Sequence, residues 1–180
     1  MTEIAWLLTT YKIPPEPAAR RMAVWRKLKG MGAVYLQGGV CLLPRTPDHV
    51  RRLKMLEKDV ADAGGECVIL ETVALDPAQE AKVMARFRAD RDDVYGEFIS
   101  KCGCFEAEIA REIATAHFTY AELEEEDADL RKLQGWFAKI QALDFYGAPR
   151  AAEAAERLAA CEAALDDYAR RVFDRHDENR

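Results

Sequence analysis

Apolar residues in the first 75 positions alternate between short unbroken runs and helical spacing. Four short runs predict strands, the first of them a central strand buried on both faces: Ile4–Thr10, Ala33–Gln37, Val40–Leu43 and Cys67–Val73. Between them, Val24 and Leu28 mark one side of a helix over about Pro17–Met31. A second predicted helix begins at Thr46-Pro47-Asp48, ends at Gly64-Gly65, and carries Val50, Leu53, Leu56 and Val60. Gly38-Gly39 separates two of the strands and predicts a hairpin.

The periodicity changes after Asp76-Pro77 and becomes helical throughout. One apolar stripe runs through Val83, Phe87, Val94, Phe98, Cys102, Phe105, Ile109 and Ile113. A second contains Leu123, Leu130, Leu133, Phe137 and Ile140, and a third contains Ala151, Ala154, Leu158, Cys161, Leu165, Tyr168 and Val172. Breaks near Phe118-Thr119 and Gly147-Ala148-Pro149 separate the three.

These patterns together predict an α+β protein. The order β-α-β-β-α-β over residues 1–75 is typical of a ferredoxin-like domain. Three helices with apolar seams predict an antiparallel three-helix bundle over residues 76–180. Exposed apolar surface on such a sheet and on long helical seams is commonly covered by a second copy, so we expect a homodimer.

The formal net charge of −6 conceals an uneven distribution. Residues 1–60 carry 11 Lys and Arg against 5 Asp and Glu, whereas the rest carries 15 against 27. This asymmetry suggests that the first third contacts an anion, although the two parts could equally complement each other electrostatically.

No run of 18 apolar residues and no signal-peptide pattern is present, so we expect a cytoplasmic protein without membrane contact. Five cysteines without framework spacing indicate reduced thiols.

The basic residues of the first third are the main candidate site. Side chains of this kind can bind nucleic-acid phosphates or a small oxyanion, or remain solvated or contact a second copy. Arg20 and Lys27 share one line of the predicted helix, while Arg21 lies nearer Val24 and Leu28. Trp25 and Tyr35 lie among these charges and suit either base stacking or the core. The candidate set is Lys12, Arg20, Arg21, Arg26, Lys27 and Arg45.

Cys102-Gly103-Cys104 is the strongest thiol motif, but residues two apart on a helix point in nearly opposite directions. Only a helix break at Gly103 would bring the two thiols to one metal or redox site, so we expect largely unreactive structural thiols. The acidic run Glu122–Asp129 is typical of a solvated helix start. We therefore predict no bound metal, no cofactor and no catalytic residues.

Three segments resemble one known family. They are WLLTTYKIP at residues 6–14, AVWRKLKGMGAVYLQGGVCLLP at residues 23–44, and LDFYGAP at residues 143–149. The resemblance is to the N-terminal domain of the ChrB-type chromate-resistance regulators, which is similar to the ferredoxin-like middle domain of PaaX-type repressors. It implies a role in chromate resistance, in transcription regulation of an operon that encodes a chromate efflux pump, with DNA or chromate as the ligand.

Two alternatives stay open beside this non-enzymatic regulator or sensor. The first is a metal-dependent nuclease, since the domain also resembles small CRISPR-associated nucleases. Those proteins hold a metal through an aspartate at the end of the first strand, where this sequence reads Thr9-Thr10-Tyr11-Lys12. The second is an interaction module for a separate chain that supplies the C-terminal domain of typical ChrB proteins.

Overall fold

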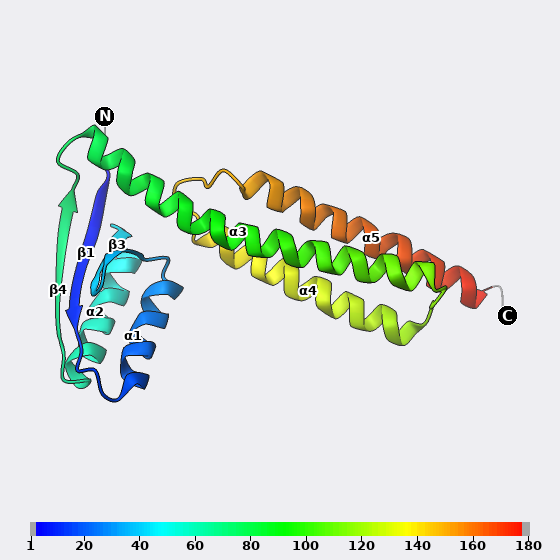
Figure 1. The fold of residues 1–180 in the computed structure, drawn as a ribbon, viewed down its shortest axis with the longest axis horizontal. Helices are drawn as coiled ribbons and strands as arrows, with labels where there is room; N and C mark the ends of the chain where they lie inside the picture. Colours follow the sequence, from blue (N-terminus) through cyan, green and yellow to red (C-terminus); the bar gives the residue numbers. More distant parts are fainter. Residues whose placement is uncertain (1–2, 178–180) are drawn as a thin grey trace. The chain divides into compact units, whose positions relative to one another are not determined.

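The computed structural model describes residues 3–177 and has an α+β fold. Its strands are β1 (Ala5–Lys12), β2 (Val34–Gln37), β3 (Val40–Pro44) and β4 (Glu66–Val73). Its helices are α1 (Ala18–Gly30), α2 (Pro47–Asp62), α3 (Pro77–Ala114), α4 (Tyr120–Ala142) and α5 (Ala151–Asp177). Figure 1 shows this order along the chain, and the strands and helices predicted from periodicity are confirmed.

The chain divides into two compact units, Met1–Phe87 and Arg88–Arg180, and helix α3 contributes to both. This division does not test the domain boundary predicted between residues 75 and 76, which stays a prediction. None of the helices in residues 3–177 holds a stretch long and apolar enough to cross a membrane.

A four-stranded antiparallel sheet in the order β2-β3-β1-β4 forms the first unit. Helices α1 and α2 cover one face of it (Figure 1), and the core between them joins Leu7, Leu28 and Leu53. The predicted hairpin is confirmed, with Gly39 at φ +71° between β2 and β3. The expectation that β1 is buried on both faces holds at Trp6, Leu7 and Thr9, while Leu8 and the residues after Thr9 are partly or fully exposed.

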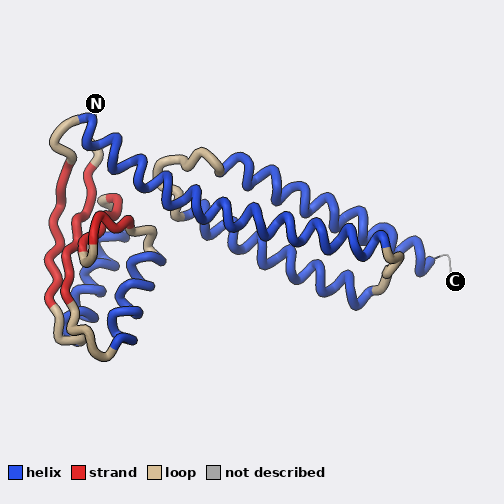
Figure 2. The backbone as a smooth tube through the Cα atoms, in the orientation of Figure 1, coloured by secondary structure: helices blue, strands red, loops and turns tan. Residues whose placement is uncertain are grey.

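The second unit consists of helices. The tube in Figure 2 shows α3, α4 and α5 as its long segments, and one apolar core joins residues of all three, among them Phe98, Phe137 and Tyr168. Helix α4 begins where Thr119 Oγ1 accepts a hydrogen bond from the backbone N–H of Glu122 at 3.2 Å, an N-cap of the usual kind. Helix α3 runs through Gly96 and Gly103 without a break.

Candidate anion-binding site

Helix α1 carries a different chemistry on each side of its buried stripe. Val24 and Leu28 lie fully in the core of the first unit. On one flank, Arg20 and Lys27 approach α2, where Lys27 Nζ lies 2.5 Å from Asp59 Oδ2. On the other flank, Arg21 and Trp25 are one turn apart and face the end of β1. The sequence prediction that Arg20 and Lys27 share a side is confirmed by this arrangement.

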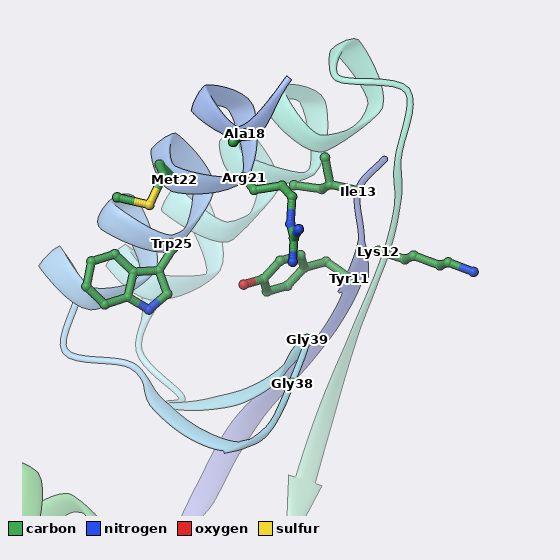
Figure 3. A pocket seen from close by; sticks show the side chains of 9 residues that line it. All are labelled: Tyr11, Lys12, Ile13, Ala18, Arg21, Met22, Trp25, Gly38 and Gly39. Atoms are coloured by element: carbon green, nitrogen blue, oxygen red, sulfur yellow. The ribbon is translucent and has the colours of Figure 1, made fainter. Parts of the chain in front are cut away.

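A cavity of about 590 Å³ opens between α1, the end of β1 and the β2–β3 turn. Trp25 and Met22 line it and are each 45% exposed, so an indole face and a thioether are available to a ligand. Figure 3 shows Arg21 reaching from α1 toward Tyr11 on β1, while the Lys12 side chain points away from the other labelled side chains. The lining residues are Tyr11, Lys12, Ile13, Ala18, Arg21, Met22, Trp25, Gly38 and Gly39.

Tyr11 and the Gly38-Gly39 turn line this cavity, and Tyr11 contacts Tyr35. The hydroxyl oxygens of Tyr11 and Tyr35 lie 2.7 Å apart, and the two rings meet edge to face. Burial, followed by the hydrogen bond with Tyr11, raises the pKa of Tyr35 above its usual value, so its hydroxyl stays protonated. The Tyr11 N–H donates to the Gly39 carbonyl at 2.9 Å and holds the turn against β1.

The structure does not bring all six predicted basic residues together. Arg21 and Lys12 line the cavity, whereas Arg20 and Lys27 lie on the other flank of α1. Arg45 follows the residue paired with Trp6, and its Nε lies 3.2 Å from Glu71 Oε2. It therefore sits at the opposite end of β1 from Lys12, about 20 Å away along an eight-residue strand. Arg26 is exposed on α1.

The chemistry that gathers at the cavity suits an anion attached to a flat apolar group. A guanidinium binds phosphate or another oxyanion through several N–H donors, and an exposed indole stacks on a planar ring. The sequence interpretation left Trp25 open between stacking and core, and did not single out Tyr11 or Met22. For the residues of α1, a signal was present in the sequence: Arg21, Met22 and Trp25 lie on one side of a helix that contains no acidic residue.

The Cys102-Gly103-Cys104 segment does not form a thiol pair. Because α3 is continuous there, Cys102 is buried in the core and Cys104 is exposed. Burial raises the pKa of Cys102, whose carbonyl oxygen lies 3.5 Å from the Cys161 sulfur. The expectation of an unreactive thiol is supported for Cys102, while the exposure of Cys104 speaks against it there.

Carboxylates gather elsewhere in the second unit. Ligand atoms of Glu108, Glu122 and Glu126 lie within 4.8 Å of one another, and so do those of Glu112, His117 and Glu122. Among the described residues, these two groups have ligand atoms close enough together to hold a metal ion. Glu122 and Glu126 belong to the acidic run that the sequence analysis interpreted as a solvated helix start.

Comparison with known proteins gives a family match over most of the chain. Residues 21–179 match the family described as Protein ChrB, N-terminal. The chain is similar to protein ChrB of Cupriavidus metallidurans, with 37% identity over 97 residues. Those residues make up 54% of this chain and 29% of that protein, so the chain covers less than a third of this curated relative. No solved structure matches the chain.

Proposed function

The chain belongs to the ChrB N-terminal family, and from this membership we propose that it is a regulatory or sensor protein of chromate resistance that binds DNA through its first unit. The single observation that carries the proposal is the family match over residues 21–179. We propose no catalytic role.

The charge and shape of the first unit support a DNA contact. Helix α1 carries five basic residues and no acidic one, in a segment of the chain whose net charge is +6 over residues 1–60. Arg21 and Arg26 are exposed and have no acidic partner among the described residues, so both are available to phosphates. Lys27 and Arg45 already pair with Asp59 and Glu71, so their contribution to binding is expected to be smaller.

We also propose a finer description of the fold. The β-α-β-β-α-β element order with strand order β2-β3-β1-β4 is consistent with a ferredoxin-like domain over residues 1–75. The shared core of α3, α4 and α5 is consistent with an antiparallel three-helix bundle over residues 76–180. In this proposal a homodimer leaves the basic helix accessible.

The experiment is a binding titration of the full chain on two duplexes at several salt concentrations. One duplex carries the promoter upstream of the chain's own gene, and the other has the same composition in scrambled order. We expect log affinity to fall linearly with log salt. Arg21→Ala, Arg26→Ala and Arg20→Ala should each weaken binding to both duplexes about equally and reduce the slope by about one.

The matched control is Arg131→Ala, which makes the same charge change on α4, where Arg131 pairs with Asp127. It should leave the affinity unchanged. Lys27→Ala should have the smaller effect expected of a residue already paired. If the unaltered protein binds neither duplex at low salt, with or without chromate, the DNA-binding proposal is wrong.

Three other outcomes separate the alternatives. Chromate binding that Arg21→Ala abolishes, without DNA binding, would identify an oxyanion sensor with its site at the cavity. Cleavage of DNA in the presence of Mg²⁺ or Mn²⁺ would identify the nuclease. Stable association with a separately produced C-terminal domain of a ChrB protein, without either ligand, would identify the interaction module.

A further inference from the structure

Helices α3 and α4 bring acidic side chains together near the turn that joins them. Glu108 and Glu112 are one turn apart on α3, and Glu122 and Glu126 are one turn apart on α4. Carboxylate oxygens of Glu108, Glu122 and Glu126 all lie within 4.8 Å of one another. Three like charges at this separation repel strongly unless a cation or protons compensate them.

The burial of Glu126 is not what is expected of an acidic residue on a solvated helix surface. Its side chain is only 4% exposed, and no hydrogen bond or ion pair of its carboxylate occurs among residues 3–177. It occupies a position between Leu123 and Leu130 on the apolar seam of α4, where the periodicity favours a hydrophobic residue. Glu126 also lines a cavity together with Glu108 and Glu122. A carboxylate that is enclosed in this way and has no partner is costly, so its retention at a core position points to a ligand.

Carboxylates outnumber cations around Glu126: Lys101 and Lys132 line the same cavity, and Lys132 pairs with Asp129. Burial raises its pKa to about 7, and the neighbouring carboxylates Glu108, Asp129, Glu122 and Glu112 act in the same direction. The nearby cation Arg111 pairs instead with Glu108 and Glu112. His117 Nδ1 lies 2.5 Å from Glu112 Oε2. Compensation of Glu126 by these protein groups is therefore incomplete.

Helix capping accounts for part of the cluster but not for all of it. Glu122 stands three residues after the N-cap Thr119, where a carboxylate is favoured by the helix dipole. Glu108 is partly exposed and interacts with Arg111. Neither role requires a third carboxylate buried against the other two.

We propose that Glu108, Glu122 and Glu126 bind a divalent cation that prefers oxygen ligands, of the class of Mn²⁺, Mg²⁺ and Ca²⁺. Metal–oxygen distances of about 2.1–2.6 Å allow two ligand atoms of one ion to lie up to about 4.2–5.2 Å apart, and the three carboxylates, all within 4.8 Å of one another, are close enough to share an ion. A cavity of about 710 Å³ lined by Glu108, Glu122 and Glu126 gives the hydrated ion access and leaves room for water ligands. The His117–Glu112 pair flanks the ion on the side of Glu122.

The test uses the full chain, stripped of metal with EDTA and dialysed, and MnCl₂ as the probe. Hexaaqua Mn²⁺ gives a sharp electron paramagnetic resonance signal that is lost on binding, so the bound fraction is measured directly. We expect saturable binding at one ion per chain and a rise in the melting temperature with Mn²⁺ concentration. Glu126→Gln should weaken Mn²⁺ binding at least tenfold and remove the rise in melting temperature.

The matched control is Glu124→Gln, the same substitution at an exposed position two residues away on the same helix. It should change Mn²⁺ affinity less than twofold. In EDTA, Glu126→Gln should melt no lower than the unaltered chain, since the amide is uncharged. If that variant does not fold, Glu108→Gln at the rim replaces it and should show the same loss of binding. Absence of saturable binding, or binding by Glu126→Gln (or by its replacement Glu108→Gln) that equals that of the unaltered chain, would overturn the proposal.

Discussion

Cys102 and Cys104 show how much the environment of a side chain changes over two positions of a helix. Cys102 lies in the core beside Cys161, and Cys104 lies at the surface. Burial raises the pKa of Cys41 and of Cys161 to about 12. Because the thiolate is the reactive form, only about one in ten thousand of either group is ionised at pH 8. Burial also raises the pKa of Cys67, which is half-buried.

We expect one of the five thiols to react at once with an aromatic disulfide reagent at pH 8, and Cys104→Ser to abolish that phase. Cys67 should follow slowly, and Cys41, Cys102 and Cys161 should react only when the protein unfolds. The measurement is the absorbance of the released thiolate, with and without denaturant. Two rapid equivalents that include Cys102 would show that α3 opens at Gly103.

Among the structural elements, the β2–β3 hairpin needs a glycine at one position for two separate reasons. Gly39 has φ +71°, and a Cβ at this position would lie 2.6 Å from the Tyr11 carbonyl oxygen. Glycine is therefore required both by the backbone conformation and by the close approach of the turn to β1. Gly38 is next to it, and a Cβ there would meet no atom within 4 Å.

Gly39→Ala should lower the free energy of unfolding by about 2 kcal/mol or more, because it combines left-handed strain with a backbone clash. Gly38→Ala should change it by less than about 0.5 kcal/mol. Urea denaturation of the two variants beside the unaltered chain measures the difference. Equal effects at both positions would mean that the turn moves away from Tyr11.

Periodicity predicted the helices and strands, but not which side chains they bring together. The spacing of apolar residues, together with proline and glycine signals at the boundaries, located the strands and helices, because an element that buries one face repeats apolar residues at its own period. It did not show that Arg45 and Lys12 stand at opposite ends of β1, since that follows from strand pairing. The cavity at Arg21 and Trp25 likewise depends on the hairpin folding back against β1. Glu126 was hidden within an acidic run, although the seven-residue gap from Leu123 to Leu130 marked its seam position.

At the scale of the whole molecule, the sheet of the first unit keeps apolar side chains at its surface. Strand alternation puts Leu8 on the face opposite Leu7, and hence opposite α1 and α2. Leu70, paired with Leu8, and Val68, paired with Thr10, share that face and are 54% and 53% exposed. Both lie on β4, an edge strand. Such an edge is suited to pairing with another chain, and the homodimer stays a prediction.

We expect light scattering to give about twice the chain mass of 20.3 kDa at micromolar concentration. Replacing Val68 and Leu70 together by lysine should shift the protein to monomer, because the charges would be buried unpaired in the dimer. Met55→Lys, on exposed Met55 of α2, is the control and should leave the mass unchanged. A mass near that of one chain for the unaltered protein would contradict the homodimer.

The position of β1 in the sheet also has a consequence for the time at which the protein folds. This strand is synthesised first, yet it lies between β3 and β4, and Ala5 pairs with Val73, 68 positions later. The sheet therefore cannot form until most of the first unit has left the ribosome. Because pairing β1 with β4 closes a long loop, the folding rate of this unit is expected to be low. The helices of the second unit close shorter loops, so the half of the chain made last is expected to fold at the faster rate.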